Sequence, residues 1–218
     1  MSIGVFITGT DTEVGKTFVA AALLRAAAHR GLRAAGMKPV ASGATHGQNA
    51  DALALRAAGN VRLPDAWLNP YCFDAPIAPH LAARDAGVTI GLASIRRAYE
   101  QIAAISDWVV VEGAGGWLTP ITATTSMQDI AIAINLPVVM VVRMRLGCLN
   151  HALLTAATIL NSGLPFAGWI ANSFGAPMER RNDNVAALRE RLSAPLLAEF
   201  GGNDLAADHA FRLLRGNS

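Results

Sequence analysis

Short apolar runs alternate with Ala- and Leu-rich segments along most of this 218-residue chain, and this alternation is the strongest constraint on its fold. The apolar runs have the composition of buried strands and cover residues 3–8, 33–40, 107–113, 136–142 and 166–172. The segments with helical spacing cover residues 18–31, 49–55, 126–135, 148–163 and 180–192. Continuous apolar strands separated by helices predict an α/β fold, in which helices cover both faces of a mostly parallel sheet.

The composition limits the kinds of partner. With 52% hydrophobic and 16% charged residues and no linker, the chain is expected to form a single domain over residues 1–218. Its formal net charge is only +2 and no basic run is present, which argues against nucleic acid. The longest apolar run, residues 136–142, falls far short of the ~20 residues that span a membrane, and the amino terminus lacks a basic segment followed by an apolar one. Cys72 and Cys148 have neither disulfide nor metal-ligand spacing. We expect a cytoplasmic protein that binds an acidic small molecule.

The stretch GTDTEVGKT, residues 9–17, resembles a phosphate-binding loop with one additional residue between its first glycine and Gly-Lys-Thr. It directly follows the first predicted strand and directly precedes the first predicted helix, which is the context such a loop requires. Gly9 and Gly15 permit close approach of the backbone to phosphate. Lys16 is placed to reach the β- and γ-phosphates, and the Thr17 hydroxyl to bind Mg²⁺. The alternative is a glycine-containing turn whose lysine is merely solvated.

Further charged residues are predicted at the same edge of the sheet. Only Lys16 and Lys38 are lysines among the 18 basic residues, and Lys38 also follows a strand-like segment. Glu112 ends another strand and precedes a Gly-Ala-Gly-Gly turn, so its carboxylate is expected at the ligand edge as a metal-binding acid. Asp51 begins a helical stretch and, by itself, is better explained as an ordinary helix-start acid than as a metal ligand.

Six motifs, in this order and spacing, resemble the dethiobiotin synthetase family over nearly the full length: GTDTEVGKT, KPVASG, NADALAL, NPYCFDAPIAPH, VVVEGAGGWLTP and LGCLNHALLT. That family has the same lengthened loop. The resemblance implies a P-loop NTPase-like fold and an ATP- and Mg²⁺-dependent cyclo-ligase. Its reaction closes diaminopelargonic acid with CO₂ to dethiobiotin, ADP and phosphate, through a carbamate and a carbamic-phosphoric anhydride, in the penultimate step of biotin biosynthesis.

The resemblance also implies roles for individual residues. The Mg²⁺ ligands are Thr17, Asp51 and Glu112, and the catalytic charges are Lys16, Lys38 and Arg145. The nucleotide contacts are Gly9, Glu13, Val14, Gly15, Lys16, Thr17, Phe18, Asp51, Glu112 and Asn172. The substrate contacts are Asp11, Thr12, Ser42, Gly115, Gly116, Leu146, Gly147, Cys148 and Asn150. Of these, residues 146–150 are implied to come from the opposing subunit of a homodimer.

The chain departs from the family pattern at two places. Arg145 stands where the family has a lysine, and Gly201, Gly202 and Asn203 stand where it has a proline-containing stretch that contacts adenine. The second departure leaves the base preference open. Asn172 is explained almost as well as an asparagine that ends a strand, and a structural role is the simpler reading of both His80 and His151.

Two other classes share related motifs. The cobyric and cobyrinic acid amidating synthetases need a glutamine-hydrolysing domain, which 218 residues cannot also accommodate. Partition-type ATPases carry a signature lysine at the position of Asp11, four residues before Gly15. These differences favour the synthetase over both alternatives.

Overall fold

A six-stranded sheet forms the centre of the computed structural model, which describes residues 3–174, 177–201 and 205–216. The strand order is β2-β5-β1-β6-β7-β8, and every neighbouring pair is parallel. These strands are β1 (Ile3–Gly9), β2 (Ala34–Met37), β5 (Trp108–Glu112), β6 (Val138–Arg143), β7 (Phe166–Asn172) and β8 (Leu196–Phe200). A separate two-stranded parallel sheet pairs β3 (Val40–Ser42) with β4 (Tyr71–Phe73).

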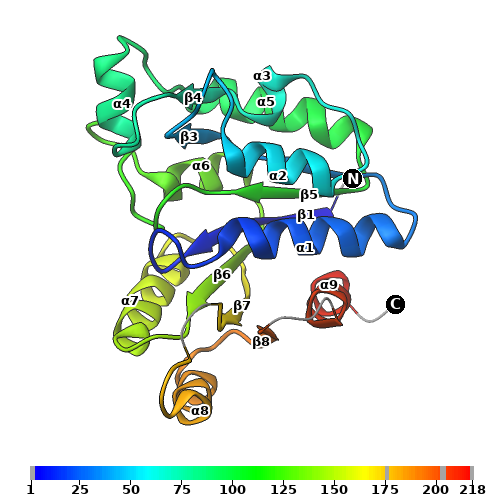
Figure 1. Ribbon diagram of the computed structural model, residues 1–218, viewed down its shortest axis with the longest axis vertical. Helices are drawn as coiled ribbons and strands as arrows, with labels where there is room; N and C mark the ends of the chain where they lie inside the picture. The colour runs from blue at the N-terminus through cyan, green and yellow to red at the C-terminus, as the bar shows by residue number, and fades with distance from the viewer. Residues whose placement is uncertain (1–2, 175–176, 202–204, 217–218) are drawn as a thin grey trace.

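Helices cover both faces of the large sheet, as the alternation in the sequence predicts (Figure 1). One face carries α1 (Lys16–His29), α2 (Ala50–Ala58) and α9 (Leu205–Arg215). The other carries α5 (Leu92–Ile105), α6 (Met127–Ile134), α7 (Cys148–Asn161) and α8 (Arg181–Arg191). Of two short helices, α4 (Pro79–Asp85) packs against the small sheet, and α3 (Asp65–Leu68) contacts α5 and β2. In the part of the chain that is described, no helix is long and apolar enough to cross a bilayer.

Each central strand contributes side chains to two hydrophobic cores. Val5 and Ile7 belong to the core beneath α1, whereas Phe6 between them belongs to the core on the opposite face. The same alternation separates Val110 from its neighbours Val109 and Val111. Successive strand residues point to opposite faces, so a strand covered on both sides must be apolar at every position. This double burial is the reason for the uninterrupted apolar runs.

The expected strand at residues 33–40 is interrupted in the structure. β2 ends at Met37, and the chain leaves the large sheet at Lys38 and Pro39 before β3 begins. Proline has no backbone N–H to donate to a sheet, so it ends the pairing. Lys38 therefore lies immediately beyond the carboxyl end of β2, and the interruption places it at the ligand edge.

Several elements were not expected from the sequence, namely α3, α4, α5, α9, β3, β4 and β8. Helix α5 was detectable, because Ile95, Ala98 and Ile102 follow helical spacing and are all buried on one side. Strand β8 is short and stands at the edge of the sheet, where Leu196 and Glu199 are not buried. A half-exposed edge strand lacks the continuous apolar run that identified the central ones.

Candidate functional site

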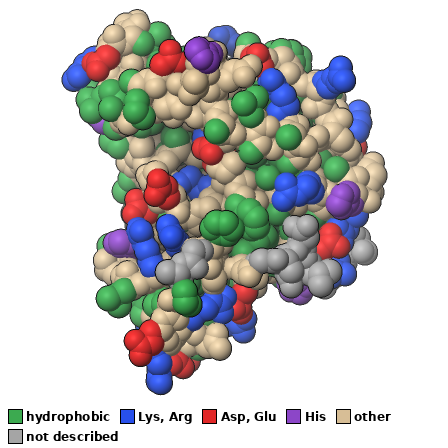
Figure 2. Space-filling model, viewed as in Figure 1, with side chains coloured by type: hydrophobic (Ala, Val, Ile, Leu, Met, Phe, Trp, Pro, Cys, Tyr) green, Lys and Arg blue, Asp and Glu red, His purple; other side chains and the backbone are tan. Residues whose placement is uncertain are grey.

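A cavity of about 790 Å³ opens at the carboxyl edge of the sheet. Its wall includes many of the residues expected from the sequence: Thr12, Glu13, Gly15, Lys16, Thr17, Lys38, Ser42, Asp51, Glu112 and Gly115. Acidic and basic side chains gather at this edge between α4 and α7 (Figure 2). The predicted convergence of both lysines with the acids at the strand ends is therefore observed.

The loop of residues 9–17, called the phosphate loop below, ends at the start of α1. Gly15 caps this helix with a φ of 95°, without a side-chain hydrogen bond to the first turn, and the first turn contains no acid. A side chain at Gly15 is excluded, because an added Cβ would lie 2.0 Å from Nδ2 of Asn172. The N–H groups of a helix start left free in this way form an anion-binding site.

Lys38 lies at the centre of a buried charge cluster. Its ammonium donates to Oε1 of Glu112 at 2.7 Å, to Oδ2 of Asp51 at 2.9 Å and to the carbonyl of Gly113 at 3.2 Å. The side chains of Lys38 and Glu112 are 3% and 0% exposed, while that of Asp51 is 42% exposed. One ammonium thus contacts two carboxylates in the cavity wall, which leaves these three side chains with a net charge of −1.

The Thr17 hydroxyl completes an oxygen-rich arrangement beside this cluster. It donates to Oε1 of Glu112 at 2.8 Å, and a second interaction with Asp51 helps to lower the pKa of that carboxyl. The other oxygen of Glu112, Oε2, is buried without a hydrogen-bond partner among the described residues. Unpaired buried carboxylate oxygens are costly unless a ligand satisfies them, so Oε2 is available to a cation.

The two lysines of the cavity have opposite pKa shifts. Burial, aided by the charge of Lys38, lowers the pKa of Lys16 to about 8. Burial also disfavours the charged form of Lys38, but the charges of Glu112 and Asp51 and their hydrogen bonds outweigh it and raise its pKa. For Asp51, burial opposes ionisation, and the nearby Lys38 charge reverses the effect and lowers the pKa.

Two asparagines that the sequence analysis did not identify hold this cluster in place. Asn49 caps α2, accepting from the N–H groups of Asp51 at 3.0 Å and Ala52 at 3.3 Å, and its amide donates to the carbonyl of Ser42 at 3.3 Å. Asn69 donates to the carbonyl of Lys38 at 2.6 Å. Asn49 was identifiable as a preferred capping residue directly before a helical stretch. No local sequence signal links Asn69 to Lys38.

The expected substrate residues divide into two groups. Thr12, Ser42 and Gly115 line the cavity, and the Ser42 hydroxyl is buried without a hydrogen-bond partner among the described residues. The N–H of Gly116 donates to the Thr119 hydroxyl at 2.8 Å, so it is already engaged. Thr119, which also lines the cavity, was not anticipated.

Residues 146–150 form the second group and lie outside the cavity wall, as far as the described residues define it. Leu146 is 95% exposed, and Gly147 and Asn150 are also exposed, at the start of α7. Cys148 is buried, and burial raises the pKa of its thiol. The segment is thus accessible on the surface of one chain and does not contact its own cavity.

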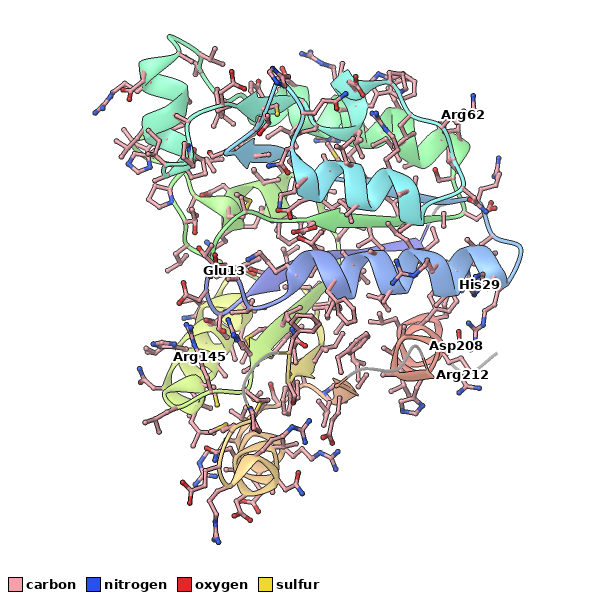
Figure 3. The ribbon with its side chains drawn as sticks, in the orientation of Figure 1. Glu13, His29, Arg62, Arg145, Asp208 and Arg212 are labelled. Atoms are coloured by element: carbon pink, nitrogen blue, oxygen red, sulfur yellow. The ribbon has the colours of Figure 1, made fainter. Side chains whose placement is uncertain are left out.

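Arg145 lies beside the phosphate loop and is not among the described residues that line the cavity. Its Nη2 is 2.9 Å from Oδ2 of Asp11, which also does not line the cavity. Nη1 of Arg143 lies 3.4 Å from the carbonyl of Glu13. Glu13 and Arg145 therefore belong to neighbouring loops ahead of α1 and α7 (Figure 3).

At the other end of the phosphate loop, Asn172 supports the backbone. Its Nδ2 donates to the carbonyl of Val14 at 2.8 Å, and its Oδ1 accepts from the N–H of Phe174 at 3.3 Å. The ring of Phe18 is 5.7 Å from the Phe174 ring and 5.7 Å from the Phe200 ring, measured between centroids. Gly9 and Val14 are buried parts of the loop. Gly201 is exposed, while Gly202 and Asn203 lie outside the described residues.

Comparison with known proteins identifies the family. A family model described as an AAA domain matches residues 3–208. An ATP-dependent dethiobiotin synthetase from Xanthomonas euvesicatoria pv. vesicatoria is 48% identical, covering 96% of this chain and 97% of the relative. The protein of the same name from Ralstonia nicotianae is 53% identical, covering 88% of this chain and 86% of the relative.

Solved structures with similar folds include P-loop proteins of other functions. The MinC:MinD cell division complex of Aquifex aeolicus contains a chain with a TM-score of 0.65 at 16% identity, with coverage of 100% of this chain and 97% of that one. The signal recognition particle receptor FtsY of Elizabethkingia anophelis gives a TM-score of 0.52 at 14% identity, with coverage of 99% and 66%. At these identities the likeness concerns the fold alone. The sequence relatives decide the family, and the chain belongs to the ATP-dependent dethiobiotin synthetases.

Proposed function

We propose that this enzyme converts diaminopelargonic acid, CO₂ and ATP into dethiobiotin, ADP and phosphate. The observation that carries the proposal is the meeting of Lys16, Lys38 and Glu112 in one cavity beside a phosphate loop. Membership of the synthetase family supplies the substrates. We further infer that residues 1–218 act as a single P-loop NTPase-like synthetase domain.

The reaction requires two anions to approach each other. An amine of the substrate adds to CO₂ with loss of a proton, and an oxygen of the resulting carbamate attacks the γ-phosphorus as the bond to ADP breaks. The second amine then attacks the carbonyl carbon of the anhydride, and phosphate leaves as the ring closes. Lys16, Lys38 and the free N–H groups at the start of α1 lower the electrostatic cost of this approach.

The oxygen donors beside Lys38 fit Mg²⁺. Within the described residues, no group of three or more His, Cys, Asp or Glu side chains is placed to hold a metal, which makes an all-protein cage unsuitable. Thr17, Asp51 and Glu112 instead provide a hydroxyl and two carboxylates, with Oε2 of Glu112 unpaired. Mg²⁺ commonly takes one or two carboxylates and completes its shell with water and phosphate. When bound, the ion would neutralise charge on the β- and γ-phosphates.

The substrate contacts are proposed to come from two chains of a homodimer. Thr12, Ser42 and Gly115 line the cavity of one subunit. Leu146 is exposed just before α7 and Asn150 in its first turn, and Leu154 and Leu160 further along the helix are 61% and 52% exposed. Large exposed apolar side chains on one helix are typical of a protein interface. Leu146, Gly147 and Asn150 would then reach the cavity of the partner, whereas Cys148, whose side chain is buried in its own subunit, would contribute only through its backbone.

A coupled assay tests the proposal. With diaminopelargonic acid, bicarbonate and MgATP, dethiobiotin and ADP are expected in equal amounts, and omission of the diamine should reduce ADP release to background. ADP release that is indifferent to the diamine would instead indicate a switch-type ATPase. The matched variants Lys16→Gln and Lys38→Gln should each lose roughly 3 to 4 kcal/mol of transition-state stabilisation, or more than a hundredfold in turnover. Near-normal turnover of either variant would remove that lysine from the mechanism.

A further inference from the structure

The phosphate loop contains a strained residue. Glu13 has a φ of 56°, in the left-handed region that residues with a Cβ adopt at a cost in free energy. The residue is also exposed, so burial of its side chain does not hold it there. A strained conformation persists where surrounding contacts maintain it. The neighbours of Glu13 are therefore informative about how the lengthened loop keeps its shape.

Two arginines reach this loop from the end of β6 and the segment that follows it: Arg143 is the last residue of β6, and Arg145 lies between β6 and α7. The Arg145 guanidinium pairs with the Asp11 carboxylate at 2.9 Å, and Arg143 donates to the carbonyl of the strained Glu13 at 3.4 Å. We call Arg143 and Arg145 the arginine brace. β6 lies next to β1 in the sheet, so the brace and the loop leave neighbouring strands at the same edge.

Asp11 connects the brace to the lysine of the loop. Its Oδ1 accepts from the N–H of Thr12 at 2.7 Å, its Oδ2 pairs with Arg145, and its carbonyl accepts from the Lys16 ammonium at 3.0 Å. Holding the Asp11 side chain therefore restrains the peptide whose carbonyl positions Lys16. Arg145 also neutralises the charge of Asp11, and neither residue is among the described residues that line the cavity. This arrangement limits the repulsion that an acid beside a triphosphate would otherwise cause.

We propose that Arg143 and Arg145 are positioning residues that hold the lengthened phosphate loop in its binding shape, Arg145 through the Asp11 carboxylate and Arg143 through the Glu13 carbonyl. The inference rests on the proposed function only in taking the occupant of the loop to be a nucleoside triphosphate. In this proposal Arg145 does not contact the reacting groups. It holds Asp11, and Asp11 in turn positions Lys16. Arg145 and Asp11 are 45% and 48% exposed, and ion pairs this open contribute little to global stability. The effect of the brace is therefore local to the loop.

The test compares Arg145→Gln with the control Arg96→Gln. Arg96 forms a similarly exposed ion pair with Glu100 on α5, far along the chain from the loop. Amide hydrogen exchange of residues 11–15 in the nucleotide-free protein should become faster in Arg145→Gln and stay unchanged in Arg96→Gln, while both keep the wild-type melting temperature. The dissociation constant for MgATP should rise about tenfold in Arg145→Gln, the scale typical of losing a group that orients a ligand-binding residue. Unchanged loop exchange in Arg145→Gln would overturn the proposal.

A double-mutant cycle separates positioning from direct contact. If Arg145 acts through Asp11, the variant Arg145→Gln/Asp11→Asn should bind MgATP no more weakly than the worse single variant. Additive losses would show that Arg145 contacts the nucleotide itself and would also overturn the proposal. Arg145→Lys, which keeps the charge opposite Asp11, should restore most of the affinity. The exchange measurement uses no nucleotide, so the brace is tested even if the enzyme fails to make dethiobiotin.

Discussion

Lys16 and Lys38 border the same cavity, and their surroundings move their pKa values in opposite directions. Lys16 is buried beside a backbone carbonyl and a second ammonium, and its pKa falls to about 8. Lys38 is at least as deeply buried, yet its contacts with Glu112 and Asp51 raise its pKa. Burial alone therefore does not determine the direction in which the pKa of a lysine shifts, because carboxylates in direct contact reverse the effect of burial.

The difference assigns distinct tasks to two chemically identical side chains. Lys38 already satisfies two carboxylates in the free protein and contributes to the fold as well as to the site. Lys16 has only the Asp11 carbonyl as its hydrogen-bond partner among the described residues, so its charge is poorly compensated until an anion arrives. The Lys16 ammonium in the phosphate loop thus lacks a carboxylate in direct contact until an anion binds, while the Lys38 ammonium at the end of β2 is already paired with two carboxylates.

The largest expected difference between the two lysines is in stability. Lys38→Met leaves the Glu112 carboxylate buried without its counter-charge and should lower the free energy of unfolding by about 3 to 5 kcal/mol. Lys16→Met removes a buried, poorly compensated charge and should instead raise it, by about 1 to 2 kcal/mol at neutral pH. Urea unfolding in EDTA measures both. The double variant Lys38→Met/Glu112→Gln should recover part of the loss, and equal losses in both single variants would contradict the comparison.

The pH dependence of stability should distinguish the lysines next. Between about pH 8 and 10.5, the unfolded chain keeps a proton on Lys16 that the folded protein has released, so this group makes the free energy of unfolding rise with pH. Relative to Lys16→Met, the wild type should gain about 2 kcal/mol between pH 7.5 and 10 in EDTA. Lys38 has the opposite effect on the free energy of unfolding. Its pKa is raised in the folded state, so the stabilisation that it provides is present below pH 10.5 and is lost as the pH rises above that value. A constant difference between wild type and Lys16→Met would refute the lowered pKa.

The smallest expected effect concerns metal binding without nucleotide. The ammonium of Lys38 lies between the carboxylates of Asp51 and Glu112, so a divalent cation must compete with it. Mn²⁺, followed by electron paramagnetic resonance, should bind folded Lys38→Met about tenfold more tightly than wild type, since removal of one adjacent positive charge is worth more than 1 kcal/mol there. Lys16→Met changes the net charge equally and serves as the control. An equal gain in both variants would mean that only net charge matters.

The sequence predicts the fold and much of the cavity because strong local signals determine both. Uninterrupted apolar strands required a sheet covered on both faces, and the ends of parallel strands brought Lys16, Lys38 and Glu112 to one edge. Asp51 was ambiguous as a helix-start acid. In the structure its carboxylate pairs with Lys38 while Asn49 caps the helix, and its role as a metal ligand stays a prediction.

The contacts that could not be predicted depend on which strands are neighbours. Asp11 and Arg145 are 134 residues apart in sequence and meet because β6 pairs with β1, a strand order that composition and periodicity do not specify. The support of Lys38 by Asn69 depends in the same way on α3, a helix too short to produce a clear periodic signal. The role of residues 146–150 could not be checked within one chain for a different reason, because contact with the substrate is expected to require a second subunit.

The position of β1 in the middle of the sheet also governs when the site is formed during synthesis. β1 pairs with β5 (residues 108–112) and with β6 (residues 138–143). The strand before the phosphate loop is therefore synthesised first, but both strands that pair with it are synthesised much later. At translation rates of about 5 to 20 residues per second, the loop is made several seconds before both neighbouring strands and before Arg143 and Arg145. A nascent or truncated chain that ends before residue 138 contains the full nucleotide-binding motif and still lacks one of the two strands that flank it.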